Sequence, residues 1–311
     1  MPRFGFALNR LLFRGSNVNR IDWYDCYTIL AEIAANDWPF TYHGALPASV
    51  TPRNCTPRRI ALLAALAACS WLAPTASAQK LTVAAAADLR FALEDLATQY
   101  QAAHPKVDLA ITYGSSGNFF AQIQNGAPFD VFLSADIDYP RKLAAAGLAA
   151  KDSVFRYAIG GIVIWVPAGS PLDPAALGMR TLEAPSVRHI AIANPQHAPY
   201  GRAAEAALRS LGVYDRVSPK LVLGENVAQT FEFVQSGAAE VGIVALSLAL
   251  APAARGHGQY WEIPQNAYPK IEQGGLILPR APSALAAEFR AFLVSEPARR
   301  ILKEYGFAVP E

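Results

Sequence analysis

Short apolar runs alternate along the chain, from residue 81 onward, with segments whose apolar residues recur at helical spacing. Residues 81–86 form the first strand-like run. The segment after it carries an apolar stripe at i, i+4, i+7 and i+11, formed by Leu89, Leu93, Leu96 and Tyr100. This alternation is typical of βαβ units that build a mainly parallel sheet.

The alternation occurs in two sets. The first set predicts strands at 81–86, 109–113 and 131–134, with a helix at 119–124. The second set predicts strands at 159–166, 189–193, 220–223 and 241–245, with helices at 202–211 and 225–236. Residues 271–310 predict one further strand and two helices that return to the first set. We therefore expect an α/β protein with two lobes, the first made of residues 79–158 and 247–311 and the second of residues 159–246.

A basic start, a short apolar segment and a small-x-small site precede this region. Arg58 and Arg59 lead into the apolar residues 60–72, and Ala-Ser-Ala follows at 76–78. These are the parts of a secretory signal, so residues 58–78 are predicted to be a signal peptide that directs the protein to the periplasm. The apolar run is well short of the roughly 20 residues that a membrane-spanning helix needs.

Two features near the signal leave alternatives open. Residues 66–69 read Leu-Ala-Ala-Cys, which also fits a lipoprotein cleavage site, so Cys69 is an alternative point of lipid attachment. Residues 1–57 precede the signal without a clear periodic pattern. We expect this extension to arise from a start codon chosen too early, with Val50 as a candidate initiator.

Composition excludes several classes of protein. With 52% hydrophobic and 17% charged residues the chain can bury a core, and its formal net charge of +2 offers no broad basic surface for nucleic acid. All three cysteines, Cys26, Cys55 and Cys69, precede residue 79. The secreted part is thus expected to hold neither disulfides nor a cysteine-ligated metal.

Loops at strand-to-helix junctions are the candidate functional positions. They comprise residues 86–89, 114–118, 199–202 and 225–228. Ligands collect at the carboxyl ends of parallel strands, and the free N–H groups of a helix N-terminus favour an anion. Ser115 and Ser116 add hydroxyl donors, while Gly114 and Gly117 allow the backbone to approach closely. The loops together predict an anion pocket built from neutral donors.

Signatures of catalysis are lacking. The sequence contains no G-x-S-x-G motif, no P-loop and no G-x-G-x-x-G motif, and its five histidines never stand three or four residues apart. We interpret His197 as solvent-facing, and Asp130, Asp136 and Asp138 as exposed structural caps. The sequence therefore predicts a protein that is neither an enzyme nor a direct binder of metal ions.

Several motifs together resemble one family. The first are LTVAAAADL at 81–89, GSSGN at 114–118 and NGAPFDVFLSAD at 125–136. Others are IAIANPQHAPYG at 190–201, GENV at 224–227, GIVALS at 242–247 and YGF at 305–307. Over residues 79–310 the chain is similar to the periplasmic molybdate-binding proteins of ABC importers.

The resemblance implies a type II periplasmic binding fold with the ligand cleft between the lobes. It implies capture of molybdate or tungstate, no cofactor, a monomer, and delivery to a membrane permease and its ATPase. The ligand contacts carried over are hydroxyl groups of Ser116 and Tyr200 and backbone N–H groups of Ala87, Asp88 and Val227. We expect the Asp88 carboxylate to turn away from the anion and cap its own helix.

The choice of anion stays open at this stage. Many relatives have Ser or Thr where this chain has Ala87, so one hydroxyl donor is missing. Neutral donors suit a fully deprotonated dianion and offer no acceptor to a protonated phosphate. Molybdate, tungstate and sulfate share charge and shape, so a binding protein for sulfate or phosphate is the alternative.

Overall fold

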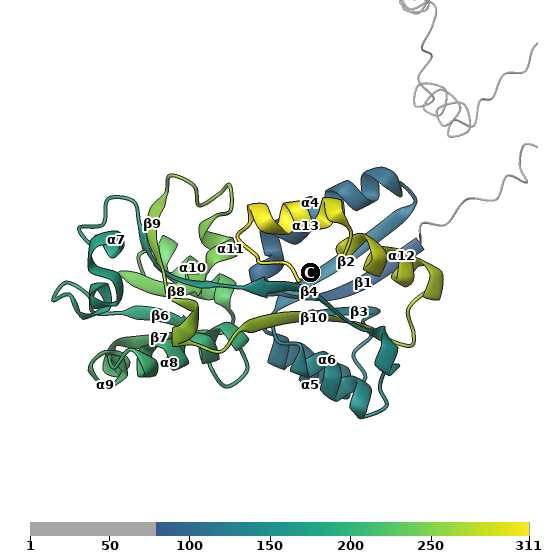
Figure 1. Cartoon of the computed structure of the whole chain (residues 1–311), viewed down its shortest axis with the longest axis horizontal. Coiled ribbons are helices and arrows are strands. Elements are labelled where there is room, and N and C mark those ends of the chain that lie inside the picture. Colours follow the sequence, from purple (N-terminus) through teal and green to yellow (C-terminus); the bar gives the residue numbers. More distant parts are fainter. Residues whose placement is uncertain (1–78, 311) are drawn as a thin grey trace, which may run out of the picture. The chain divides into compact units, whose positions relative to one another are not determined.

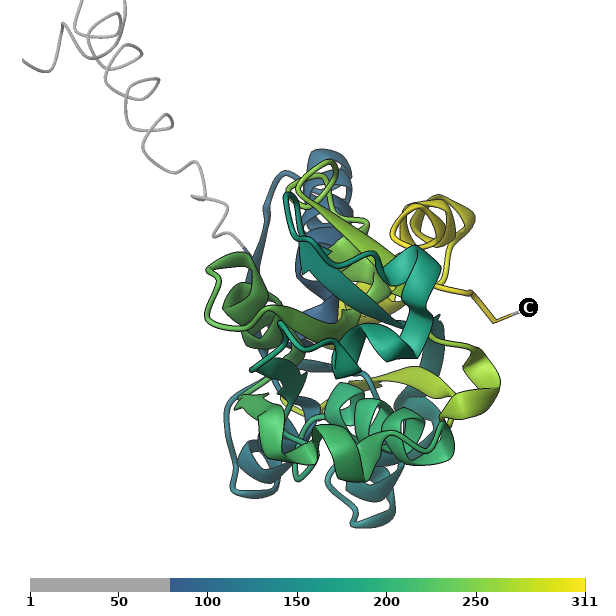
Figure 2. The same ribbon diagram turned by 90° about the vertical axis from the view of Figure 1, so that its left-hand side faces the viewer.

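The computed structural model describes residues 79–310. The predictions for the N-terminal extension, the signal peptide and Cys69 lie outside the described residues. The described part contains two sheets, each of five strands. Figure 1 shows the two sheets side by side, each with its own helices, and Figure 2 views the same part from the second lobe.

The first sheet has the strand order β2-β1-β3-β10-β4. Its strands are β1 (Gln79–Ala86), β2 (Val107–Gly114), β3 (Val131–Ser134), β4 (Val154–Gly160) and β10 (Ile271–Ile277). Only β10 runs against its neighbours, β3 and β4, whereas β1 pairs in parallel with β2 and β3. The predicted mainly parallel sheet is confirmed for this lobe.

The second sheet has the order β7-β6-β8-β5-β9. Its strands are β5 (Ile162–Pro167), β6 (Ile190–Ala193), β7 (Leu221–Gly224), β8 (Val241–Ala245) and β9 (Gly258–Glu262). Here β5 runs against β8 and β9, whereas β6 is parallel to β7 and β8. Both sheets are thus built on the same plan, with one reversed strand next to the outermost strand.

Helices cover both faces of the first sheet. They are α4 (Arg90–Ala103), α5 (Ser116–Gln124), α6 (Asp138–Ala145), α12 (Ser283–Leu293) and α13 (Glu296–Glu304). Alternate strand residues point to opposite faces: Val83 packs with the cluster under α4, whereas Ala84 packs with Phe119 of α5. Figure 1 accordingly shows α4, α12 and α13 on one side of the sheet and α5 and α6 on the other.

Helices also surround the second sheet, and short turns join the elements. The helices are α7 (Pro174–Leu177), α8 (Pro199–Ser210), α9 (Tyr214–Val217), α10 (Val227–Gln235) and α11 (Leu246–Ala249). The 3-10 turns are η1 (Ala87–Leu89), η2 (Lys151–Ser153), η3 (Gly178–Glu183), η4 (Ser218–Lys220) and η5 (Gln265–Ala267). Trp165 of β5 is fully buried against Phe231 of α10 at a ring separation of 4.7 Å and anchors this core. None of the described helices has the length and apolarity needed to cross a membrane.

Two strands lie where the sequence analysis did not place them. The predicted single strand at 159–166 is wrong, because β4 ends at Gly160 and β5 begins at Ile162 in the other sheet. The structure also places β9 in the second sheet, whereas the sequence analysis assigned residues 247–311 to the first lobe. The chain therefore crosses between the lobes twice, from β4 to β5 and from β9 to β10.

Candidate functional site

Strand-to-helix loops from both lobes meet at one small pocket. The first lobe contributes residues after β1 and β2, and the second lobe contributes residues after β6 and β7. The lining includes all the predicted site residues, Ala87, Asp88, Ser116, Tyr200 and Val227. The cavity measures about 10 Å³, roughly the room that one water molecule needs.

Helix N-termini point into this pocket for local reasons that the sequence contains. Pro199 occupies the first turn of α8, where its missing N–H costs nothing. Asn226 caps α10, and its side chain accepts hydrogen bonds from Ala228 N and Gln229 N, both at 3.0 Å. The helix predicted at 202–211 begins earlier, at Pro199, so Tyr200 lies in a helical turn. The cap uses two first-turn N–H groups of α10 and leaves that of Val227, which has no partner within its own helix, available to an anion.

Adjacent serines in the second loop have different tasks. Ser115 Oγ donates its hydrogen to the carbonyl oxygen of His197 at 2.6 Å. Ser116 Oγ instead accepts from Ala135 N at 2.9 Å. The hydroxyl hydrogen of Ser116 makes no hydrogen bond within the described residues, although the residue is only 1% exposed. Of the two, Ser116 is therefore the one with a donor to offer to a ligand.

The Asp88 carboxylate is not a helix cap, and that prediction is wrong. The α4 helix begins after Leu89 without a side-chain cap, and Asp88 lies in the preceding turn η1. Its Oδ2 accepts hydrogen bonds from Tyr200 Oη at 2.9 Å and from the Gln273 amide. The carboxylate turns to these partners because both are buried donors. Burial raises the pKa of Asp88 to about 6, although both hydrogen bonds act to lower it.

Tyr200 lines the pocket and lies close to Gly160, where the chain crosses between the lobes. Its hydroxyl donates to Asp88 and accepts from Gln273 Nε2 at 3.2 Å. A Cβ atom at Gly160 would stand 2.2 Å from this hydroxyl, so only glycine allows Tyr200 to reach Asp88. Gln273 escaped the sequence analysis, because it lies 185 residues from Asp88 and no local pattern marks it.

His197 joins the two lobes, and the interpretation of it as solvent-facing is wrong. Its carbonyl oxygen accepts from Gly117 N at 2.9 Å as well as from Ser115, and its Nδ1 lies 3.0 Å from Ser115 Oγ. Its Nε2 lies 3.7 Å from Oε2 of Glu225, and Asn118 donates a hydrogen bond to Oε1 of the same carboxylate. We call these five residues, Ser115, Gly117, Asn118, His197 and Glu225, the clasp.

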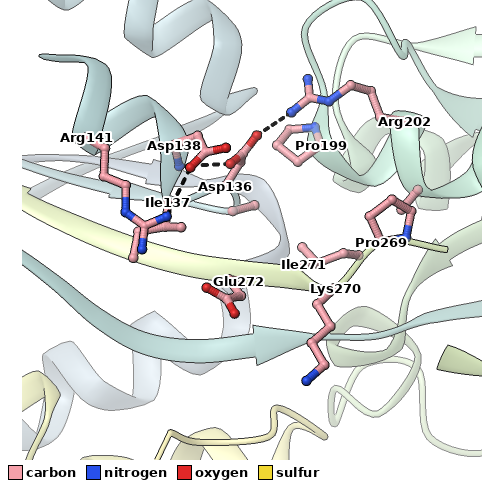
Figure 3. Close-up of a pocket in the computed structure, with 12 residues that line it drawn as sticks. Asp136, Ile137, Asp138, Arg141, Pro199, Arg202, Pro269, Lys270, Ile271 and Glu272 are labelled. Carbon is pink, nitrogen blue, oxygen red and sulfur yellow. Dashed lines mark hydrogen bonds and ion pairs between the residues drawn. The ribbon is translucent and has the colours of Figure 1, made fainter. Parts of the chain in front are cut away.

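A larger cavity of about 380 Å³ lies beside the pocket, between α6, α8 and the start of β10. Figure 3 shows Arg202 reaching from α8 to Asp136, at 2.6 Å, while Lys270 points away from this pair. Charges of both signs line this cavity, which does not suit a small anion. The predicted cap Asp136 therefore links the lobes, whereas Asp138 is an exposed partner of Arg141 at 3.1 Å.

The third predicted cap, Asp130, is buried rather than exposed. It is only 4% exposed, and its Oδ2 accepts from Thr82 N at 2.8 Å and from Thr82 Oγ1 at 2.6 Å. Its role is structural, because it ties the loop before β3 to β1. In residues 79–310, no group of three or more His, Cys, Asp or Glu side chains is arranged to hold a metal ion.

The fold agrees with a comparison against known families. The family model described as bacterial extracellular solute-binding protein matches residues 81–308. The chain therefore belongs to the bacterial extracellular solute-binding proteins.

Individual proteins similar to this chain include molybdate-binding proteins. The molybdate-binding protein ModA of Rhodobacter capsulatus is 36% identical over 78% of this chain and 94% of its own length. The solved structure of the periplasmic molybdate-binding protein of Azotobacter vinelandii matches 74% of this chain and 100% of its own, with 36% identity and a TM-score of 0.69. A putative ABC transporter substrate-binding lipoprotein of Bacillus subtilis (strain 168), YvgL, is 29% identical over 73% of this chain and 85% of its own length. The resemblance predicted from the motifs, and the fold that it implied, are confirmed.

Proposed function

We propose that this protein captures molybdate between its two lobes and delivers it to an ABC importer, and that it catalyses no reaction. The names of its relatives support this ligand and this partner. The proposal includes tungstate as a second ligand, a monomeric state, a permease and an ATPase as partners, and no cofactor. It also includes a periplasmic location, reached through the signal at 58–78 or held by a lipid on Cys69.

One observation carries the proposal. Loops from both lobes bring helix N-termini to a single pocket whose lining contains no Lys, Arg or His. A pocket of neutral N–H and O–H donors suits a small dianion, because each donor gains a charge-assisted hydrogen bond without a competing cation. The proposed contacts are the hydroxyls of Ser116 and Tyr200 and the backbone N–H groups of Ala87, Asp88 and Val227.

Ligand entry requires the lobes to part. The cavity of about 10 Å³ has room for about one water molecule, so the lobes must part to admit an anion with four oxygens, and lining side chains such as Tyr200 must shift to make room for it. The two crossings, β4 to β5 and β9 to β10, are the covalent links about which a hinge motion can occur. The clasp and the Asp136–Arg202 ion pair would then re-form over the bound ligand.

Titration with a series of oxyanions tests the proposal. Residues 79–311 are purified, freed of bound anions, and titrated by calorimetry with molybdate, tungstate, sulfate and phosphate. We expect tight binding of one anion per chain for molybdate and tungstate, with sulfate and phosphate much weaker. Elemental analysis after exposure to a mixture of all four checks the preference directly. Tighter binding of sulfate or phosphate would support the alternative function.

A further inference from the structure

Asp88 places a carboxyl group in the wall of the pocket proposed to bind a dianion. The residue lines the pocket and is 1% exposed. Its Oδ2 holds the hydrogen bonds from Tyr200 and Gln273, whereas its Oδ1 is buried and has no hydrogen-bond partner within the described residues. A buried acceptor that receives no hydrogen bond costs free energy, so the protonation state of this carboxyl group needs an explanation.

Within residues 79–310, no cation compensates this carboxyl group. The side chains that face it or its backbone are Tyr157 of β4, Tyr200 of α8, Ser247 of α11 and Gln273 of β10, and all are uncharged at neutral pH. Burial dominates the balance and favours the neutral form of Asp88.

The charged groups on the other elements packed against η1 are engaged elsewhere. On α4 and α10, Arg90 forms ion pairs with Glu94 at 3.9 Å and with Glu232 at 3.3 Å. On β2, Asp108 is exposed at the far end of the strand, and Tyr113 is a neutral phenol whose hydroxyl is buried. A dianion entering the pocket would therefore face an ionised Asp88 without any opposing charge, which repels it.

We propose that Asp88 takes up one proton from solvent when the anion binds, and that its Oδ1–H then donates a hydrogen bond to the anion. The inference rests on the proposed function and adds to it that binding is coupled to protonation. The proton binds Oδ1 because Oδ2 already accepts two hydrogen bonds. It returns to solvent when the anion leaves.

Protonation of Asp88 also releases Tyr200. An ionised carboxylate holds the Tyr200 hydrogen at 2.9 Å in a charge-assisted hydrogen bond, so that hydrogen is not available to a ligand. A neutral carboxyl is a weaker acceptor, which frees the hydroxyl to turn toward the anion. Protonated Asp88 further supplies the donor that the alanine at position 87 lacks.

The sign of the pH dependence follows from linkage. The complex holds one proton more than the free protein plus free anion, so affinity falls as pH rises above the pKa of free Asp88, about 6. The dissociation constant for molybdate should rise about tenfold per pH unit between about pH 7 and about pH 9. Molybdate stays fully deprotonated in this range, so the protein alone supplies the dependence.

Calorimetry in buffers of different ionisation enthalpy counts the proton. Wild-type protein titrated with molybdate at about pH 8 should take up about one proton per anion bound. Asp88→Asn should take up none and bind with the same affinity at every pH, more tightly than wild type at the alkaline end. Ser116→Ala, the matched control, should weaken binding at every pH and keep the wild-type slope. An infrared band of a protonated carboxyl should appear on binding to wild type and be absent in Asp88→Asn.

Results contrary to these expectations distinguish a failure of the Asp88 proposal from a failure of the proposed function. Tight molybdate binding by wild type without proton uptake would overturn the role of Asp88 and leave the proposed function intact. A slope that persists in Asp88→Asn would place the proton on another group and overturn the inference as well. Failure of molybdate to bind wild type at any of these pH values would overturn the proposed function itself. The proton count on wild type stands even if the variant does not fold.

Discussion

Replacing Gly117 with alanine should block closure of the lobes without damaging either lobe. Gly117 belongs to α5 of the first lobe, and a Cβ atom there would stand 2.5 Å from the carbonyl oxygen and 2.9 Å from the Cα atom of His197 in the second lobe. Both contacts are with backbone atoms, which cannot rotate away as a side chain would. The α5 helix and the loop of His197 must therefore move apart.

The magnitude follows from the hydrogen bonds that this separation breaks. The closed form of the variant loses two hydrogen bonds to the His197 carbonyl oxygen. Gly117 N donates one at 2.9 Å, and Ser115 Oγ donates the other at 2.6 Å. At about 1 kcal/mol each, the closed form loses about 2 kcal/mol, which corresponds to about 30-fold weaker binding of molybdate. Within α5, alanine is a better helix former than glycine by up to about 1 kcal/mol. The variant should thus bind less tightly while its lobes stay as stable as before.

Isothermal titration with molybdate and thermal unfolding of the ligand-free protein test this prediction together. Gln122→Ala, an exposed change on the same helix, is the matched control and should leave both measurements unchanged. An affinity for Gly117→Ala equal to that of wild type would refute the reasoning, because it would show that ligand binding does not need the clasp. A loss of affinity together with a lower melting temperature would point instead to a damaged lobe.

Two further predictions concern Ser116, a proposed ligand donor, and the buried carboxylate of Asp130. Ser116→Ala should weaken molybdate binding about tenfold in calorimetry, because it removes the free hydroxyl hydrogen, whereas Ser236→Ala on the surface should have no effect. Equal affinities for these two variants would remove Ser116 from the site. Asp130→Ala should lower the free energy of urea unfolding by about 2 to 4 kcal/mol, since it leaves the Thr82 N–H without its acceptor. Asp138→Ala, which breaks only an exposed ion pair, should cost less than about 1 kcal/mol, and a similar loss for both would contradict this account.

The local sequence pattern was sufficient to predict features that depend only on residues within one helix or loop. The apolar stripe on α4 predicted a helix with one buried face, and Leu93 and Leu96 are indeed buried. The loops after β1, β2, β6 and β7 were predicted as the candidate functional positions, and residues of all four line one pocket, whereas their binding of an anion stays a prediction. The prediction of the helix and of its buried face succeeded because backbone periodicity acts over a few residues.

The sequence by itself therefore determined two α/β lobes, the helix N-termini and the supply of neutral donors. Only the tertiary structure decided that residues 159–166 divide between two sheets, that His197 holds the first lobe, and that Asp88 meets Gln273 from a strand 185 residues away. An apolar run is compatible with one strand or two, and a polar side chain takes whichever partner the fold brings within reach. Pairings between distant residues depend on how the whole chain packs, and that information is absent from any short window of sequence.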